Sequence, residues 1–484
     1  MPAAGKRLPL RLRFPSSPEP QHLRSNSPPR LIFDYVGRVR WITLVILTCA
    51  LATGLYLKGG SVPHQWNWSI FGIAVAGILY WATLRSRERA LRDPWTTRLV
   101  AAFAAWSVFQ IVPLPPWLVG VLSPMRAELS RAVGATGWTS LSIAPAETFS
   151  RLLELGGAIV TFLLARELCW WWRGRSWIAA APLLVVGIVE ALIGAAQAYV
   201  QGASDSPVGV SGSYVNKNHY AALLEMTLPL ALAAGAAVYR AGFLPHARPA
   251  APAIKASALM GCGALMLAAL AASQSRMAFL GALCSLAVMG IISITAVEQR
   301  VYRPAPIGRR LLAGGAVLAA VGLLFLLVPP KALIERYGLL ASSGGDIGDA
   351  RLGIWRESIP MIKAYPLVGC GLGAYESGFM RFKKVAPMFR VDFAHNDYLQ
   401  ILVELGIVGL AIGLALVVRI VSSVLRVALF HKESFGWELA VGLAGAITAL
   451  LLHSGADFSL YIPANAMTLA WICGLAVSPG LREY

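Results

Sequence analysis

Twelve apolar runs, each long enough to cross a bilayer as a helix, constrain the fold of this chain more than any other feature. A membrane helix needs roughly 17 or more apolar residues. Such runs occur at 41–57, 68–84, 98–114, 150–168, 177–200, 218–239, 256–272, 277–298, 311–329, 396–418, 437–454 and 463–479. Hydrophobic residues make up 57% of the chain and charged residues 14%, which excludes an ordinary soluble globule. We predict an all-α polytopic membrane protein with about 12 transmembrane helices.

The runs divide the chain into four segments. Residues 1–40 are basic and rich in Pro and Ser, and we expect a disordered cytosolic tail there. Transmembrane helices 1–9 are expected within 41–329, a long external loop with short helices at 330–394, and helices 10–12 within 395–484. If the spans alternate, most of the 42 Lys and Arg residues fall on the side of the tail. Because short basic loops stay inside, both termini are expected in the cytosol.

Charge and cysteine content narrow the function classes. The net charge of +18 is explained by Lys and Arg residues that set the orientation of the chain in the membrane and attract anionic headgroups. It therefore does not indicate binding to nucleic acid. The six cysteines are scattered without a C-x-x-C or Cys/His ligand spacing. We expect neither a disulfide framework nor a metal site, and no cofactor.

The stretch 391–413 is the strongest candidate for a functional site. A polar head with His395 and Asn396 runs without a turn signal into an apolar segment, so His395 is expected in the first turn of a membrane helix. At spacings of four, Asn396, Gln400 and Glu404 share one face, a polar stripe that must face the bundle interior or a wet cavity. We interpret this cavity as the active site. His395 is expected to be neutral and able to accept a proton, although a structural histidine is the alternative.

Cations retained on the external side are candidates for binding an anion. Arg276 follows Ser273-Gln274-Ser275 between two spans, at the membrane edge, where a guanidinium usually has an anionic partner. In the long loop, Arg351, Trp355 and Ser358 share a helix face, whereas Arg356 points elsewhere. The alternative for the loop arginines is that they anchor an interfacial helix or pair with nearby acids.

Two further loops could bind a ligand or simply shape the backbone. Asn216, Lys217 and Asn218 precede a helix, whose free amides and adjacent lysine favour an anion. The asparagines could equally be caps. The G-x-G-x-G run within 365–375 has no preceding strand, so we interpret it as a structural turn and not as a nucleotide site.

Several of these motifs occur in an order that resembles the O-antigen ligase and polymerase superfamily. The order is S-x-S-R at 273–276, R-x-x-x-W at 351–355, P-L-V-G-x-G-x-G-x-Y at 366–375, and A-H-N-D-Y-L-Q-x-L-x-E-x-G at 394–406. The upstream G-S-Y-V-N-K-N-H-Y-A is similar too, and the resemblance covers most of 98–415, with the ligase-related region ending at about 415.

The resemblance implies a metal-independent, inverting glycosyltransferase of the bacterial inner membrane. Such an enzyme moves a glycan from a polyprenyl-pyrophosphate carrier to an acceptor, such as lipid A-core or a glycan, on the periplasmic side. The resemblance assigns the pyrophosphate to Arg276 and Arg351 and acceptor activation to His395; Arg356 and Lys217 are added as further candidates. A neutral histidine and several guanidinium groups suit this chemistry without a metal ion.

Two alternatives stay open at this point. A polymerase of the same superfamily would instead assemble the polysaccharide chain. A transporter would instead depend on Glu190, Glu404 and an unwound helix, and His395 would be dispensable. The enzyme hypothesis predicts that His395, Arg276 and Arg351 converge within about 10 Å.

Overall fold

The computed structural model describes residues 30–83, 93–200, 209–242, 250–298, 347–384, 390–431 and 436–482. These ranges contain helices and no β-strand; the one β-bridge pairs Leu114 with Thr139. The longer helices are α1 (Arg30–Tyr56), α2 (Pro63–Ala82), α3 (Pro94–Phe109), α6 (Pro145–Trp171), α7 (Trp177–Val200), α8 (Lys217–Ala241), α9 (Ala250–Ala272), α10 (Arg276–Glu298), α13 (Ile347–Ala364), α15 (Asp397–Phe430), α16 (Trp437–His453) and α17 (Pro463–Val477). The shorter ones are α4 (Pro116–Leu122), α5 (Pro124–Ala132), α14 (Tyr375–Phe379) and the 3₁₀ turns η1 (Lys58–Gly60), η2 (Ser459–Tyr461) and η3 (Pro479–Leu481).

The apolar runs form helices wherever the structure describes them, and the chain is a membrane protein with many helices. Among the described residues, α1, α7, α8, α9, α10 and α15 are long and apolar enough to cross a membrane, and α16 and α17 are shorter apolar helices. The expected span at 311–329 lies outside the described residues, so the total of twelve stays a prediction. Helix α8 is central, because 78% of its apolar window is buried inside the protein.

Local sequence explains where many helices begin. Proline occupies the first turn of α2, α3, α4, α5, α6 and α17, where its missing N–H is not needed. Asp93, Asn216 and Asn396 each cap a helix by accepting a hydrogen bond from a backbone N–H of the first turn. Helix α1 begins at Arg30, so it extends into the segment that was expected to be a disordered tail up to residue 40.

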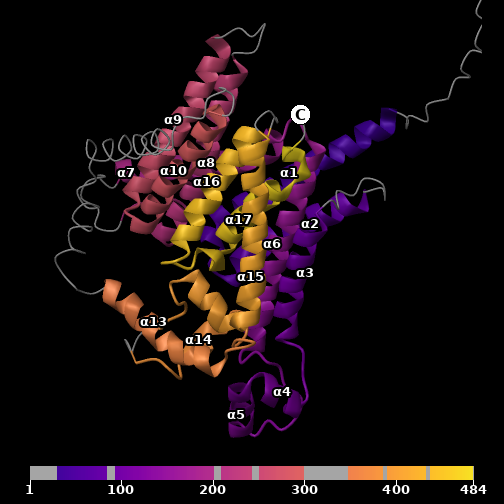
Figure 1. Cartoon of the computed structure of the whole chain (residues 1–484), viewed down its shortest axis with the longest axis vertical. Coiled ribbons are helices and arrows are strands. Elements are labelled where there is room, and N and C mark those ends of the chain that lie inside the picture. The colour runs from indigo at the N-terminus through magenta and orange to yellow at the C-terminus, as the bar shows by residue number, and fades with distance from the viewer. Residues whose placement is uncertain are drawn as a thin grey trace, which may run out of the picture.

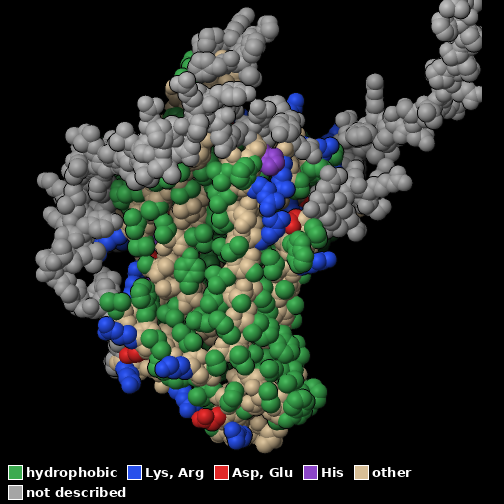
Figure 2. All heavy atoms as spheres, viewed as in Figure 1, with side chains coloured by type: hydrophobic (Ala, Val, Ile, Leu, Met, Phe, Trp, Pro, Cys, Tyr) green, Lys and Arg blue, Asp and Glu red, His purple; other side chains and the backbone are tan. Residues whose placement is uncertain are grey.

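The helices that are not candidate membrane spans include four that gather at one end of the bundle. Figure 1 places α4, α5, α13 and α14 together at the bottom, and the C-terminus and the first turns of α1 at the opposite end. Between the two ends, hydrophobic side chains cover most of the visible face, whereas Lys and Arg gather near the bottom and at the upper right (Figure 2). The expected long loop therefore contains the helices α13 and α14, although its residues 330–346 lie outside the described ranges.

Helix α15 departs from the uniform helix that the sequence suggested. It is interrupted at Gly406, whose φ of 66° and ψ of −174° are not helical, and it continues to Phe430. The Trp106 indole donates to the carbonyl of Leu405 at 3.0 Å, and the Gln110 amide donates to that of Glu404 at 2.8 Å. These side chains satisfy carbonyls that the interruption leaves without a helical partner.

Candidate functional site

A buried carboxylate, Asp457, lies at the centre of the site. It belongs to the loop between α16 and η2 and is 1% exposed. Its Oδ1 lies 3.8 Å from His219 Nε2 and 3.7 Å from His395 Nδ1. Its Oδ2 lies 3.8 Å from His453 Nε2 and 3.9 Å from Arg351 Nη2. Four basic side chains from separate segments therefore surround one carboxylate.

Backbone hydrogen bonds fix the Asp457 loop against the start of α15. The N–H of Asp397 donates to the carbonyls of Ser454 (2.8 Å) and Asp457 (3.1 Å). Arg351 Nη1 donates to the carbonyl of Ala456 at 2.8 Å, which joins α13 to the same loop. Arg351 therefore serves both the loop backbone and the Asp457 carboxylate.

The electrostatics keep Asp457 ionised. Burial by itself raises the pKa of this carboxyl, but the imidazoles of His219, His395 and His453 outweigh it and hold the pKa well below its usual range. A carboxylate that stays negative can orient the N–H of a facing imidazole and stabilise it when it becomes protonated.

His395 lies just outside the helix that was expected to contain it. It precedes the cap residue Asn396, which accepts from the N–H of Leu399 at 3.0 Å, and its φ is 51°. A left-handed conformation is uncommon for a residue with a side chain, and such strain clusters at functional sites. The expectation of a first-turn position is therefore wrong, because Asn396 and not His395 starts the helix.

The side chain of His395 is held on one face and open on another. Its Nδ1 faces Asp457, its ring meets Phe458 edge to face with the centroids 4.8 Å apart, and 33% of the side chain is exposed. His219 meets the same phenyl ring at 4.7 Å but is 7% exposed. Of the two imidazoles, His395 is the one that an incoming molecule can reach.

A second carboxylate lies behind the site. His453 Nδ1 and Glu225 Oε1 are 2.9 Å apart, and both side chains are 0% exposed. Glu225, His453 and Asp457 thus form a buried row of alternating acids and imidazole, contributed by α8, α16 and the following loop. The sequence interpretation gave His453 no role and missed Asp457, although the pair stands at positions i and i+4.

The polar stripe on α15 faces the interior of the protein, where Gln400 and Glu404 form hydrogen bonds with other protein groups. Glu404 accepts hydrogen bonds from Gly373 N (2.7 Å), Tyr375 N (3.3 Å), Gln400 Nε2 (3.0 Å) and Tyr461 OH (2.7 Å). Gln400 Oε1 accepts from the N–H of Ala394 at 2.7 Å. Gln400 and Glu404 therefore hold the segment before His395 and the glycine-rich loop in place.

The glycine-rich loop is a structural turn that docks into the interruption of α15. The N–H of Cys370 donates to the carbonyl of Val403, and that of Gly371 donates to the carbonyl of Glu404, both at 3.0 Å. Gly369 has a φ of 73°, and a Cβ there would clash with the backbone oxygen of Glu404.

The start of α8 reaches the site through His219. Asn216 caps this helix, with its Oδ1 accepting from the N–H of Asn218 at 2.9 Å. Lys217 and Asn218 are half-buried. Asn216 is therefore a helix cap, as one of the two interpretations expected. Lys217, the first residue of α8, lies two residues before His219 in the sequence.

Arg276 lies at the same end of the bundle as His453. A Cβ on Gly281 of α10 would lie 2.9 Å from the Ala449 carbonyl, and one on Gly445 would lie 2.7 Å from Ser285 Oγ. The helices α10 and α16 are therefore antiparallel, which puts Arg276, the first residue of α10, near the level of the last residue of α16.

The cationic candidates do not all join the centre. Arg351 and His395 meet at Asp457, whereas Arg356 is exposed on α13. Among the described residues, no group of three or more His, Cys, Asp or Glu side chains could hold a metal ion.

Residues 261–414 match a protein-family model described as O-antigen ligase. Over these residues the chain is similar to the O-antigen ligase family. The match confirms the family that the order of motifs indicated, and no curated protein sequence matches the chain. The O-antigen ligase region contains Arg276, Arg351 and His395, whereas Asp457 and His219 lie outside it.

Proposed function

We propose that this chain is a membrane glycosyltransferase of the O-antigen ligase type, which moves a glycan from a polyprenyl pyrophosphate to an acceptor hydroxyl. The proposal rests on one observation: within an O-antigen ligase region, His395 and Arg351 meet at the buried carboxylate of Asp457. This arrangement places a possible base beside a guanidinium that suits a diphosphate.

The proposed reaction needs one proton transfer and one departing diphosphate. Asp457 orients the Nδ1–H of His395, so Nε2 accepts the proton of the acceptor hydroxyl. The hydroxyl oxygen attacks the anomeric carbon of the donor, forms the new C–O bond with inversion, and the bond to the pyrophosphate oxygen breaks. Arg351, with Arg276 and Lys217 near the same end of the bundle, stabilises the charge on the leaving diphosphate, so the reaction proceeds without a metal ion. Arg356 is exposed on α13, and we give it no role in this step.

We further propose that the end bearing α13 and α14 faces the periplasm and that both termini face the cytoplasm of a bacterial inner membrane. The start of α1 and the C-terminus lie at one end of the bundle, which supports an even number of crossings between them (Figure 1). The cation-rich short loops of the sequence support a cytoplasmic location for that end.

The test is transfer by the purified protein in nanodiscs, with a polyprenyl-pyrophosphate glycan as donor and lipid A-core as acceptor. We expect glycan attachment by the unaltered protein and its loss in His395→Ala and Arg276→Ala. Arg390→Ala is the control, because Arg390 forms exposed ion pairs with Glu376 and Asp392. If both site variants still attach glycan while a solute flux falls, the chain is a transporter. If the product is a longer lipid-linked glycan, the acceptor is the growing polymer.

A further inference from the structure

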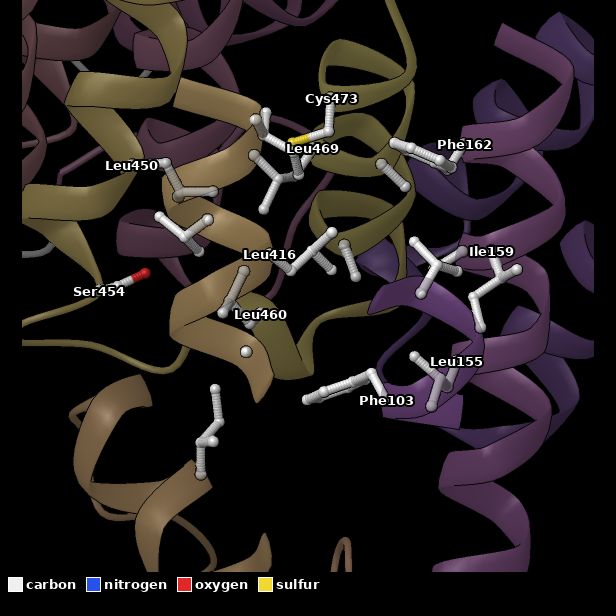
Figure 3. Close-up of a pocket in the computed structure, with 18 of the residues that line it drawn as sticks. Phe103, Leu155, Ile159, Phe162, Leu416, Leu450, Ser454, Leu460, Leu469 and Cys473 are labelled. Atoms are coloured by element: carbon white, nitrogen blue, oxygen red, sulfur yellow. The ribbon is translucent and has the colours of Figure 1, made fainter. Parts of the chain in front are cut away.

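A cavity of about 340 Å³ lies beside the site, between α3, α6, α15, α16 and α17. Apolar side chains form nearly all of its wall. Figure 3 shows Phe103, Leu155, Ile159 and Phe162 on one side and Leu416, Leu450, Leu469 and Cys473 on the other. Its size falls within the roughly 300–1,000 Å³ of small-molecule sites.

One end of the cavity is polar because of Arg151, a residue that the sequence interpretation did not consider. Its Nη1 donates to Glu154 Oε2 at 2.7 Å and to the carbonyl of Tyr461 at 3.2 Å. The guanidinium carbon also lies 5.5 Å from the Tyr461 ring centroid, and the side chain is 24% exposed. A cation at the end of an apolar cavity suits an apolar chain that carries an anionic head.

The polar end adjoins the proposed reaction centre. Ser454 and Leu460, which line the cavity, flank Asp457 in the chain, and the N–H of Leu460 donates to Asp397 Oδ2 at 3.3 Å. Phe393, two residues before His395, stacks on Phe458 with the centroids 4.1 Å apart and also lies 5.8 Å from the Arg151 guanidinium carbon. Phe393 therefore connects Arg151 at the end of the cavity with Phe458, whose ring meets that of His395.

We propose that the cavity holds the isoprenoid units nearest the diphosphate of the donor lipid, with Arg151 beside that diphosphate. The inference rests on the proposed function, since it names where the carrier of that reaction binds. A phospholipid acyl chain has similar chemistry, but the polar end next to His395 favours the chain whose own head reacts there. Arg151 is then a positioning residue for the donor, and Glu154 keeps its guanidinium oriented while the site is empty.

Cavity-filling substitutions test the chain-binding part. Ala158→Phe and Gly413→Leu add bulk inside the cavity, and Gly156→Leu is the matched control because Gly156 has no atom near its Cβ position. Transfer is measured with two donors, the polyprenyl form and a form whose glycosyl diphosphate carries only a methyl ester. We expect KM for the polyprenyl donor to rise at least tenfold in both cavity variants, with KM for the methyl donor and the control unchanged.

A double variant tests the head-group part. Arg151→Gln/Glu154→Gln removes both charges of this ion pair together, so neither member is left without the other. We expect KM to rise about tenfold for both donors. A tenfold change in affinity corresponds to about 1.4 kcal/mol of binding free energy. Equal effects of the cavity variants on both donors, or none on either, would overturn the inference.

A binding measurement keeps the inference separable from the proposed function. Each variant in nanodiscs is titrated with polyprenyl diphosphate that carries no sugar, and bound lipid is counted by native mass spectrometry. Weaker binding by the cavity variants supports the inference even if the unaltered protein transfers no glycan. Undiminished prenyl binding with loss of co-purified phospholipid would identify the cavity as a structural lipid site and refute it.

Discussion

Replacing Asp457 by asparagine keeps the size of the side chain and removes the charge that faces His395. In the proposed reaction the imidazole becomes positive as it accepts the hydroxyl proton, so the carboxylate stabilises the transition state more than the ground state. Two unit charges 3.7 Å apart gain about 4.5 kcal/mol at an effective dielectric constant of about 20.

The net effect is smaller than this Coulomb energy. His395 is 33% exposed, and Arg351 lies 3.9 Å from the same carboxylate and offsets part of its charge. We expect a loss of about 3–4 kcal/mol, which lowers kcat about 10²–10³-fold. KM for the donor should change much less, because the charge acts mainly after binding.

The assay is steady-state glycan transfer by Asp457→Asn, His395→Ala and the double variant. Because Asp457 acts through His395, the double variant should be no slower than His395→Ala alone. Asp392→Asn is the control, as this exposed carboxylate pairs with Arg390 outside the site. Two results would refute the coupling of Asp457 to His395. One is a kcat for Asp457→Asn within about threefold of the unaltered protein. The other is a loss of kcat in the double variant equal to the product of the two single losses.

Three further predictions follow from the packing around the site. Glu225→Leu removes the nearer of the two carboxylates that face the fully buried imidazole of His453, so unfolding should become easier by about 3–5 kcal/mol. A double Glu225→Leu/His453→Leu variant should recover much of that loss in thermal unfolding. The pKa of Asp457 is depressed in the folded protein, so its ionised form stabilises the fold at pH 5–8, and this contribution is lost below about pH 4. The difference in melting temperature between the unaltered protein and Asp457→Asn should therefore be constant above about pH 5 and shrink on acidification. Burial raises the pKa of the Cys370 thiol well above its ordinary value, so this thiol should resist maleimide in the folded protein and react after denaturation in detergent; rapid labelling in the native state would contradict the docked loop.

The glycine-rich loop could be interpreted from the sequence, but its partner could not. The absence of a preceding strand favoured a turn, and the structure shows one. The docking of Gly369 and Gly371 against the Glu404 backbone depends on the interruption of α15 at Gly406. No local sequence pattern predicts that interruption. Glu404 was therefore assigned to an active-site cavity, whereas two of its four hydrogen bonds hold the loop and the other two come from Gln400 and Tyr461.

The sequence by itself indicated the apolar helices, the cap at Asn216 as one of two interpretations, and the family, because apolar length, cap residues and motif order are properties of short segments. It also identified His395 and Arg351 as candidates. The tertiary structure alone decided that Asp457 joins them, and that His219 and His453 face the same carboxylate. His219 and Asp457 are more than 200 residues apart in the sequence. The Asp457 carboxylate can stay ionised while buried because the packing of α8, α13 and α16 brings its basic partners together.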